Sequence, residues 1–590
     1  MCGFLGALSF NDSNFQNIRA ANTRLICRGP DNTKQFSDNK ELNIDLIFNR
    51  LKILDLDDLA NQPMLLKDNI LMFNGEIYNH IELRKELKSK GCIFKTNHSD
   101  TEVILNGLNL EGIHFVKKLI GQFSIAYLNK NQKKLFLIRD RMGQKPLYYT
   151  YTNHELYFGS DLIAVSKLSN KEVIREDSIK EYLKLGVVSS PNTIFEAIKK
   201  VEPAEILEFG YETNKIKYQK SKFWNLNKYI NNQKFNTDEF FDLFNNAINI
   251  RNNADVPVAN FLSGGLDSTS IVKNQFDQDQ NIINTFSVTF DNKMYDESFW
   301  SAMVSKKYNT NHTVYHLTKK ELIHNIDNSL DSLDEPYADP SVVPSYLLSK
   351  LISTKYKVAI SGDGGDELLG GYRRVYNSLS YNKFLSNPYK VIYNLYPAFL
   401  GTGNFFKSHS NTISQRYKSF LEDEKLLKLL SIEDSKSSIF MEDINDNYKL
   451  LLATDYKYFL NEMMMYKVDK TSMANSLEVR SPFVDHRLIE YIFSHDTSYL
   501  NFHKPKKILQ DYLSADFDTK FTNRTKQGFV FDTKEWVYSN IDKIENQIFN
   551  GKIVKDLNPK IVSILKVNKS RINSLRLWKL FVLEKYFSNI

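Results

Sequence analysis

The chain has 590 residues, which is too long for one hydrophobic core and predicts two or three domains. A composition of 42% hydrophobic and 25% charged residues is that of an ordinary globular protein and excludes a low-complexity chain. The net charge is only +7 and the charges are scattered, so neither a nucleic acid nor a membrane surface is expected as a partner.

Three cysteines, Cys2, Cys27 and Cys92, are too few for a disulfide framework and favour a reducing compartment. The opening MCGFLGALSFND has no basic start and no long apolar stretch, which argues against a signal peptide. No segment approaches the roughly 18 apolar residues typical of a membrane span. We therefore expect a cytoplasmic protein.

Residue patterns predict strands at 42–48, 70–73, 123–129 and 135–140. Helical spacing of apolar residues predicts a helix over 79–90, which Gly91 ends. From about residue 206 to 235 the chain becomes polar. We interpret 206–235 as a linker between a first domain, 2–205, and a second domain, 236–590.

In the second domain, strands and helices alternate. The segments 256–262, 283–290 and 358–361 are predicted to be buried strands, with helical segments between them. This alternation predicts a doubly wound α/β domain, in which helices cover both faces of a parallel sheet.

Cys2 has an unusual chemical option. Removal of Met1 would make it the first residue, and its own α-amine could then activate its thiol, as in N-terminal nucleophile (Ntn) enzymes. The alternative is a small buried residue, which is what a free cysteine usually is.

Other segments of the first domain suit an amino-acid substrate. Arg50 follows a strand, and its planar fork can bind a carboxylate. The amide of Asn74 and the adjacent Gly75 N–H can form an oxyanion hole. Asp100 would place a carboxylate for an ammonium group. Taken singly, an Asn-Gly pair is more often a turn and Ser-Asp-x-Glu more often a helix cap.

Taken together, these residues resemble the glutaminase domain of class II glutamine amidotransferases. The match includes RGPD at 28–31, NGEIYN at 74–79 and Arg139-Asp140. It implies an Ntn-type αββα sandwich, with Cys2 as the nucleophile and Asn74 and Gly75 as the oxyanion hole. The glutamine-binding residues that it implies are Arg50, Leu51, Ile53, Leu54, Asn74, Gly75, Glu76 and Asp100.

A glycine-rich loop, SGGLDS at 263–268, follows a buried strand and opens a helix. Its glycines let the backbone approach an anion, and Asp267 can hold Mg²⁺ against phosphate oxygens. A tight turn would also explain the Gly-Gly pair, and the Walker pattern is absent. A second loop, 361–367, ends another strand. In a doubly wound sheet the two loops converge on one crevice, with Asp366 as a second Mg²⁺ ligand.

SGGLDS resembles the pyrophosphate (PP) loop of synthetases that cleave ATP between the α- and β-phosphates and adenylate a carboxylate. The resemblance implies that Lys526 faces the phosphates, and we expect Asp363 to tune formation of the acyl-adenylate. The ATP-binding residues expected are Leu262, Ser263, Gly264, Gly265, Asp267, Ser268, Val288, Ser361 and Gly362, with Mg²⁺ on Asp267 and Asp366.

Nearly the whole chain resembles the glutamine-hydrolysing asparagine synthetases. This implies that ammonia released at Cys2 is channelled to aspartate adenylated by ATP, giving AMP and pyrophosphate. Asp363 stands where many members have Glu, and the sequence of this loop resembles that of a branch that includes amidotransferases of cell-surface polysaccharide pathways. A sugar acid therefore stays open as the acceptor. A stand-alone N-terminal cysteine amidohydrolase with an inactive synthetase half is the second alternative, and a homodimer is left open.

Overall fold

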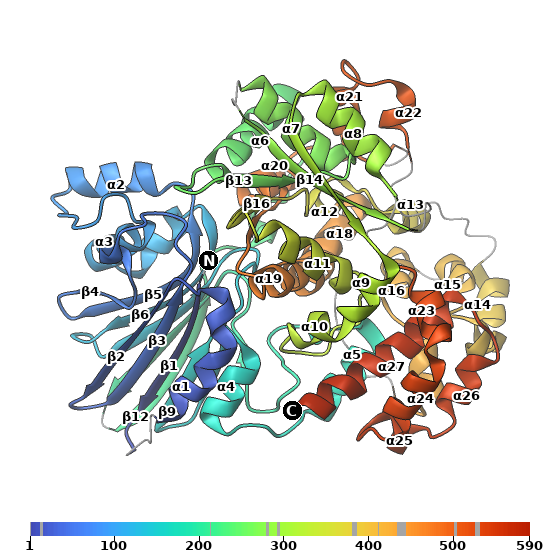
Figure 1. The fold of residues 1–590 in the computed structure, drawn as a ribbon, viewed down its shortest axis with the longest axis horizontal. Coiled ribbons are helices and arrows are strands. Elements are labelled where there is room, and N and C mark those ends of the chain that lie inside the picture. Colours follow the sequence, from blue (N-terminus) through green and yellow to red (C-terminus); the bar gives the residue numbers. More distant parts are fainter. Residues whose placement is uncertain are drawn as a thin grey trace.

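A computed structural model describes residues 2–11, 16–212, 214–278, 282–291, 296–379, 386–410, 412–433, 444–500, 504–524 and 531–590. Figure 1 shows a sandwich of sheets formed by the N-terminal part, beside a second sheet surrounded by helices. Lys526, predicted to face the phosphates, lies outside the described residues.

Two six-stranded antiparallel sheets form the N-terminal domain. The first has the order β10-β8-β9-β1-β3-β2, with strands Lys199–Lys200, Tyr148–Tyr151, Glu155–Gly159, Gly3–Ser9, Asn43–Arg50 and Asn32–Asn39. The second has the order β12-β11-β7-β6-β5-β4, with strands Lys215–Lys222, Glu205–Glu212, Lys134–Arg139, Gly121–Asn129, Asn69–Ile77 and Met64–Leu66. The strands expected at 42–48, 70–73, 123–129 and 135–140 are β3, β5, β6 and β7.

Strand alternation explains the layers of this domain. In β1, Phe4 and Leu8 point into the core between the sheets, whereas Leu5 and Ala7 point outward. The outward faces are covered by helices, which confirms the αββα sandwich. The helices are α1 (Gln16–Asn22) and α4 (Leu162–Ser169) on the first sheet, and α2 (His80–Ser89) and α3 (Asp100–Glu111) on the second.

The polar stretch 206–235 differs from the linker expected there. Its first half forms most of the β11–β12 hairpin, and β11 pairs with β7. Strand β12 is an edge strand whose side chains are mostly exposed, so polar and lysine residues are suited to it. After a short 3₁₀ turn, helix α6 (Thr237–Arg251) begins the second domain.

The second domain contains a five-stranded parallel sheet with the order β15-β14-β13-β16-β17. The chain starts at the centre, moves outward to one edge, and returns to the other side of β13. In this arrangement the carboxyl ends of β13 and β16 form a switch point, where ligands bind in such folds. The strands are β13 (Val258–Phe261), β14 (Asn284–Phe290), β15 (Asn311–Leu317), β16 (Val358–Ile360) and β17 (Glu478–Arg480).

Helices cover both faces of this sheet, which confirms the doubly wound α/β fold (Figure 1). Those that contact the strands include α7 (Leu266–Asp277), α8 (Ser298–Lys307) and α19 (Met465–Met473), whereas α11 (Val342–Ile352) packs on α19 and α20 (His486–Ser494) packs on α6. Outside them lie further helices, including α12 (Gly365–Leu369), α13 (Arg373–Leu379), α14 (Ser386–Leu395), α16 (Ile413–Leu421), α18 (Asn447–Thr454), α21 (Lys507–Leu513), α23 (Thr533–Ser539), α24 (Ile541–Phe549) and α27 (Arg571–Asn589). Within the described ranges, no helix is long and apolar enough to cross a membrane.

Candidate active sites

Cys2 stands directly before β1 and is 7% exposed. Its backbone N–H donates to Asn74 Oδ1 at 3.1 Å, and its carbonyl oxygen accepts from Arg28 Nε at 3.1 Å. Burial raises the pKa of the Cys2 thiol, although the backbone N–H of Leu51 acts in the opposite direction. The predicted nucleophile is thus fixed on both sides of its backbone, and a base is needed to generate its thiolate.

Asn74 and Gly75 lie side by side in β5. Asn74 Nδ2 donates to Ser124 Oγ at 3.4 Å, so both ends of this side-chain amide have partners. Gly75 has a φ of +153°, and a Cβ there would lie 2.0 Å from the backbone oxygen of Gln122. Position 75 therefore requires glycine, and the strand brings this backbone close to Cys2 through Asn74.

Arg50 ends β3, and its guanidinium is turned toward its own loop. The two hydrogens of Nη1 are donated to Asp57 O and Asn61 Oδ1, both at 2.8 Å. Nη2 donates to Leu54 O at 3.3 Å and to Asp55 O. The fork predicted to bind a substrate carboxylate is therefore occupied here by the loop that carries Leu51, Ile53 and Leu54.

Glu76 and Asp100 are both buried in this region. Asp100 begins α3, and its Oδ2 accepts the backbone N–H of Ile77 at 3.1 Å. Glu76 Oε2 lies 3.2 Å from Nη2 of Arg480, which comes from β17 of the second domain. Burial raises the pKa of both carboxyl groups, and Arg480 opposes the rise at Glu76. The pocket wall predicted for glutamine is thus shared with the second domain.

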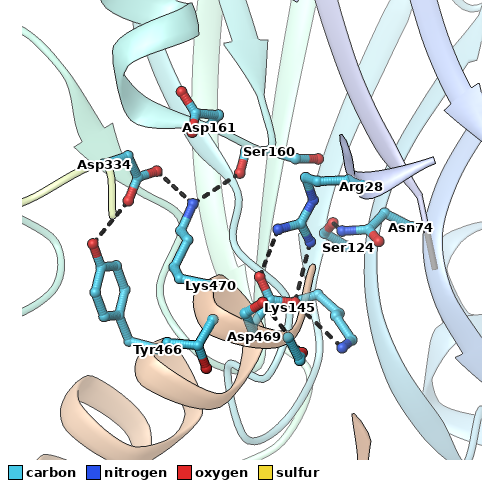
Figure 2. Close-up of polar contacts among 12 residues, drawn as sticks. Arg28, Asn74, Ser124, Lys145, Ser160, Asp161, Asp334, Tyr466, Asp469 and Lys470 are labelled. Carbon is cyan, nitrogen blue, oxygen red and sulfur yellow. Dashed lines mark hydrogen bonds and ion pairs between the residues drawn. The ribbon is translucent and has the colours of Figure 1, made fainter. Parts of the chain in front are cut away.

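Asp469 makes a second contact between the domains (Figure 2). It comes from α19 and accepts two hydrogen bonds from Arg28, at 2.8 and 3.1 Å. Lys145 Nζ lies 3.4 Å from the same carboxylate. Burial alone would raise the pKa of Asp469, but Arg28 and Lys145 lower it to about 2. Because Arg28 also donates to Cys2 O, Asp469 is connected to the predicted nucleophile through a single residue, Arg28.

The next residue of α19, Lys470, also contacts the first domain. Its Nζ lies 2.5 Å from Asp334 Oδ2 and 3.3 Å from Ser160 O in the first domain (Figure 2). Tyr466 OH donates to the other oxygen of Asp334 at 2.9 Å. Helix α19 therefore contacts the first domain through the ion pairs of Asp469 and through the hydrogen bond from Lys470 to Ser160 O, while Lys470 pairs with Asp334 of its own domain.

The two glycine-rich loops at the carboxyl ends of β13 and β16 are in contact. A Cβ at Gly362 would lie 2.8 Å from Asp267 Cβ, and one at Gly365 would lie 2.5 Å from Asp267 Oδ1. Within the first loop, the Gly265 N–H donates to Ser263 Oγ at 3.2 Å, and Ser268 Oγ donates to Gly265 O at 3.3 Å. The structure thus brings together the residues that the sequence places around one crevice.

Lys506 places its ammonium between the two loops. Its Nζ lies 2.5 Å from Asp267 Oδ2 and 2.5 Å from Asp366 Oδ1. The two predicted metal ligands are therefore close enough to share one cation. Oxygen ligands from one or two carboxylates, completed by phosphate oxygens, are what Mg²⁺ prefers, so the residues fit this metal. No cluster of three or more His, Cys, Asp or Glu side chains suited to a metal occurs in the described part of the chain.

Val288 lies beyond the end of β13. The pairing of β13 with β14 ends at Phe261 and Phe286, and Leu262 N–H donates to Phe286 O at 2.8 Å. Backbone groups of alternate residues point to the same side of a strand. The N–H and C=O of Val288 are therefore on the side of β14 that faces β13, beyond the last pair of that ladder.

Asp363 is half-buried in the second loop, and its Oδ2 accepts from Ser361 Oγ at 2.8 Å. Ser361 is in turn attached to the end of β17. Its N–H donates to Arg480 O at 2.9 Å, and its Oγ lies 3.0 Å from Ser481 Oγ. The strand that reaches Glu76 in the first domain thus also holds the loop of Asp363.

Residues 239–581 match the family model described as asparagine synthase, and residues 1–224 match the model described as a glutamine amidotransferase domain. The chain belongs to the asparagine synthase family. Asparagine synthetase [glutamine-hydrolyzing] 1 of Bacillus subtilis is 29% identical, over 99% of this chain and 96% of that protein. A Methanocaldococcus jannaschii relative whose name carries the same words, asparagine synthetase [glutamine-hydrolyzing], is 32% identical over 78% of this chain and 92% of its own length.

As a member of the asparagine synthase family the chain is a ligase, and ATP is a substrate of this family. Three residues around its candidate sites were not singled out in the sequence: Asp469, Arg480 and Lys506. The segment that carries the first two resembles the family, yet nothing local distinguishes them from structural residues. Lys506 had no signal beyond being one of three lysines in HKPKK.

Proposed function

We propose that this chain is a glutamine-dependent asparagine synthetase. Ammonia is released at Cys2 and used on a carboxylate that the second domain has adenylated. The observation that carries the proposal is the shared support of the two sites. Asp469 and Arg480 of the second domain are bound to Arg28 and Glu76 beside the predicted nucleophile.

In the glutaminase half, the Cys2 thiol transfers its proton to the free α-amine that removal of Met1 would expose. The thiolate attacks the side-chain carbonyl of glutamine, and the oxyanion is stabilised by the Asn74 amide and the Gly75 N–H. The C–N bond breaks and ammonia leaves with the proton from the amine. Water then hydrolyses the thioester to glutamate and restores the thiol.

The residues that surround the substrate amino acid have separate tasks. Asp100 and Glu76 offer carboxylates to its ammonium group. Arg50 orders the loop of Leu51, Ile53 and Leu54, because the four hydrogens of its terminal nitrogens bind that loop. A contact between Arg50 and the substrate carboxylate therefore has to come from Nε or from a rearranged loop.

In the synthetase half, backbone groups of Ser263 to Gly265 and the start of α7 receive the phosphates. Leu262, Val288, Ser361 and Gly362 frame the adenine and ribose. Mg²⁺ held by Asp267 and Asp366 would neutralise phosphate charge as pyrophosphate leaves. A carboxylate oxygen of the acceptor attacks the α-phosphorus, and ammonia then displaces AMP to give the amide.

Ammonia has to cross between the domains. A cavity at their interface is lined by residues of both, including Tyr148, Lys200, Tyr466 and Lys470. It lies beside Asp469, which contacts Arg28 and so the carbonyl group of Cys2. This position supports passage of ammonia along the interface.

The acceptor is tested by pyrophosphate release from ATP with ammonia present, comparing aspartate with uronic acids. We expect aspartate to be used. Release that depends on a uronic acid and not on aspartate would favour the surface-polysaccharide alternative. That alternative is suggested by Asp363, which stands where many family members have the longer Glu. No release with any acceptor, while glutamine is still hydrolysed, would favour the stand-alone amidohydrolase.

The division of labour is tested by Cys2→Ala and Asp267→Ala. Cys2→Ala should abolish use of glutamine and spare use of ammonia, whereas Asp267→Ala should abolish synthesis with either. Intact-mass measurement of the purified chain supplies the control, because a retained Met1 would leave no free amine at Cys2. Unchanged glutamine-dependent synthesis by Cys2→Ala contradicts the proposal.

A further inference from the structure

Lys506 lies where the loops that follow β13 and β16 meet. Its ammonium is 2.5 Å from an oxygen of Asp267 and 2.5 Å from an oxygen of Asp366. The Lys506 side chain is 6% exposed, and those of the two aspartates are 13% and 7% exposed. The ammonium thus occupies the point between the two carboxylates at which a divalent cation is expected.

The surroundings are shaped for this lysine. A Cβ at Gly371 would lie 2.5 Å from Lys506 Cε and 1.9 Å from Asp366 Oδ1, so a side chain there would displace the ion pair. Lys506 itself has a φ of +54° and a ψ of 37°, a left-handed conformation that is unfavourable for a residue with a Cβ. Such backbone strain persists where the surroundings fix it, often at functional sites.

Charge balance shows what the lysine does there. Two neighbouring carboxylates with little access to water repel each other, and a nearby cation relieves the repulsion. Mg²⁺ would bind the same oxygens at about 2.1 Å and therefore cannot share the site with the ammonium. Entry of the metal requires Lys506 to leave, and leaving is costly for a buried ammonium unless it gains a new anionic partner.

ATP brings such a partner, because its phosphate oxygens lie against the same two loops in the proposed function. We propose that Lys506 is a resident counter-ion: it holds Asp267 and Asp366 together in the nucleotide-free enzyme and excludes a divalent cation until ATP arrives. The inference rests on the proposed function in taking Asp267 and Asp366 as the metal-binding carboxylates and in placing the ATP phosphates against these two loops. Metal and nucleotide then bind together, and the metal alone does not bind.

Mn²⁺ is a suitable probe, because its free and bound forms are distinguished by electron paramagnetic resonance. The full chain without nucleotide is titrated with Mn²⁺ as wild type and as Lys506→Met, which keeps the length of the side chain and removes its charge. We expect the variant to bind Mn²⁺ at least about tenfold more tightly than the wild type. We also expect the melting temperature of the variant, and not that of the wild type, to rise with Mn²⁺.

Lys507→Met is the matched control, since this neighbour pairs with Asp511 at the surface. It should bind Mn²⁺ as weakly as the wild type. In the double variant Lys506→Met/Asp366→Asn the gained site should disappear, because one of its two carboxylates is gone. If Lys506→Met gains no affinity while it is folded, the inference is wrong.

A measurement on the wild type can overturn the inference even if Lys506→Met does not fold. Mn²⁺ binding should be detected with a non-hydrolysable ATP analogue and not without it. Tight nucleotide-free binding by the wild type would overturn the inference. These titrations involve neither glutamine nor an acceptor, so they are independent of whether aspartate is the substrate.

Discussion

The exchange Asp469→Asn removes one negative charge from the domain interface and keeps the shape of the side chain. Asp469 and its partner Arg28 are 3% and 4% exposed. The pKa of Asp469 is about 2 in the folded chain, against an ordinary value of 3.8. That difference corresponds to about 2.5 kcal/mol of stability at neutral pH. Breaking a buried pair by removing one partner typically costs about 3–5 kcal/mol, so we expect a loss of about 3 kcal/mol.

The exchange Asp469→Asn should lower glutamine hydrolysis and leave the ammonia-dependent reaction nearly unchanged. Arg28 loses its bidentate anchor, and Cys2 loses the fixed donor to its carbonyl oxygen. We expect kcat/KM for glutamine hydrolysis to fall about tenfold or more, equivalent to about 1.4 kcal/mol. The rate of ammonia-dependent pyrophosphate release should differ from that of the wild type by less than about threefold. A tenfold change would require the loss of about 1.4 kcal/mol at the synthetase site as well. Glutamate formation, pyrophosphate release and urea unfolding are the assays.

Two further variants make this experiment specific. Adding Lys145→Met to Asp469→Asn removes a buried cation that the first change leaves without its carboxylate, and should restore part of the lost stability. Asp511→Asn removes an exposed carboxylate and should change stability by less than about 0.5 kcal/mol. Equal losses of glutamine-dependent and ammonia-dependent activity, or no loss of either, would refute the positioning role of Asp469.

Three other predictions follow from the same sites. Because the pKa of Asp469 is lowered, its contribution to stability is complete above about pH 4 and is lost as the pH falls toward about 2. Between these values the urea midpoint of Asp469→Asn should therefore depend less on pH than the midpoint of the wild type. Gly75→Ala should abolish glutamine hydrolysis, because its Cβ would lie 2.0 Å from a backbone oxygen, whereas Gly210→Ala, with nothing within 4 Å, should be active. Arg480→Met leaves two buried carboxylates, Glu76 and Glu478, without their cation and should raise KM for glutamine at least about tenfold. An unchanged KM would mean that the Arg480–Glu76 pair does not support substrate binding.

The sequence predicts those parts of the molecule whose information is local. The strands of the sandwich follow from alternation, and the two glycine-rich loops follow from glycines placed between a strand and a helix. Lys506, Asp469 and Arg480 depend instead on partners elsewhere in the chain. Arg28 and Asp469 are separated by 441 positions, so no window of sequence shows that they meet. Only the packing of α19 against the first domain gives Asp469 its role.

The hairpin of β11 and β12 shows a different reason for a missed feature. Polar composition led to a linker being expected at 206–235, yet an edge strand is also polar because little of it is buried. In β12 the side chain of Ile216 is buried, whereas those of its other residues are exposed. The alternation of Leu207, Phe209 and Tyr211 with Glu208, Gly210 and Glu212 in β11 is the sequence signal by which the hairpin could have been recognised.

Strand β17 gives a physical reason why the two sites occur in one chain. Its Arg480 side chain is fully buried and reaches Glu76, while its backbone pairs with Ile360 in β16. The loop that follows β16 carries Asp363, and Ser361 attaches that loop to the same end of β17. A shift of this loop on nucleotide binding would therefore move Arg480 or break a ladder hydrogen bond. Arg480 is also paired with Glu478 of the same strand, at 2.6 Å, so moving it away from Glu76 would leave the buried Glu76 without its cation while Arg480 keeps Glu478. The loop of Asp363 and the predicted glutamine ligand Glu76 are thus both attached to strand β17.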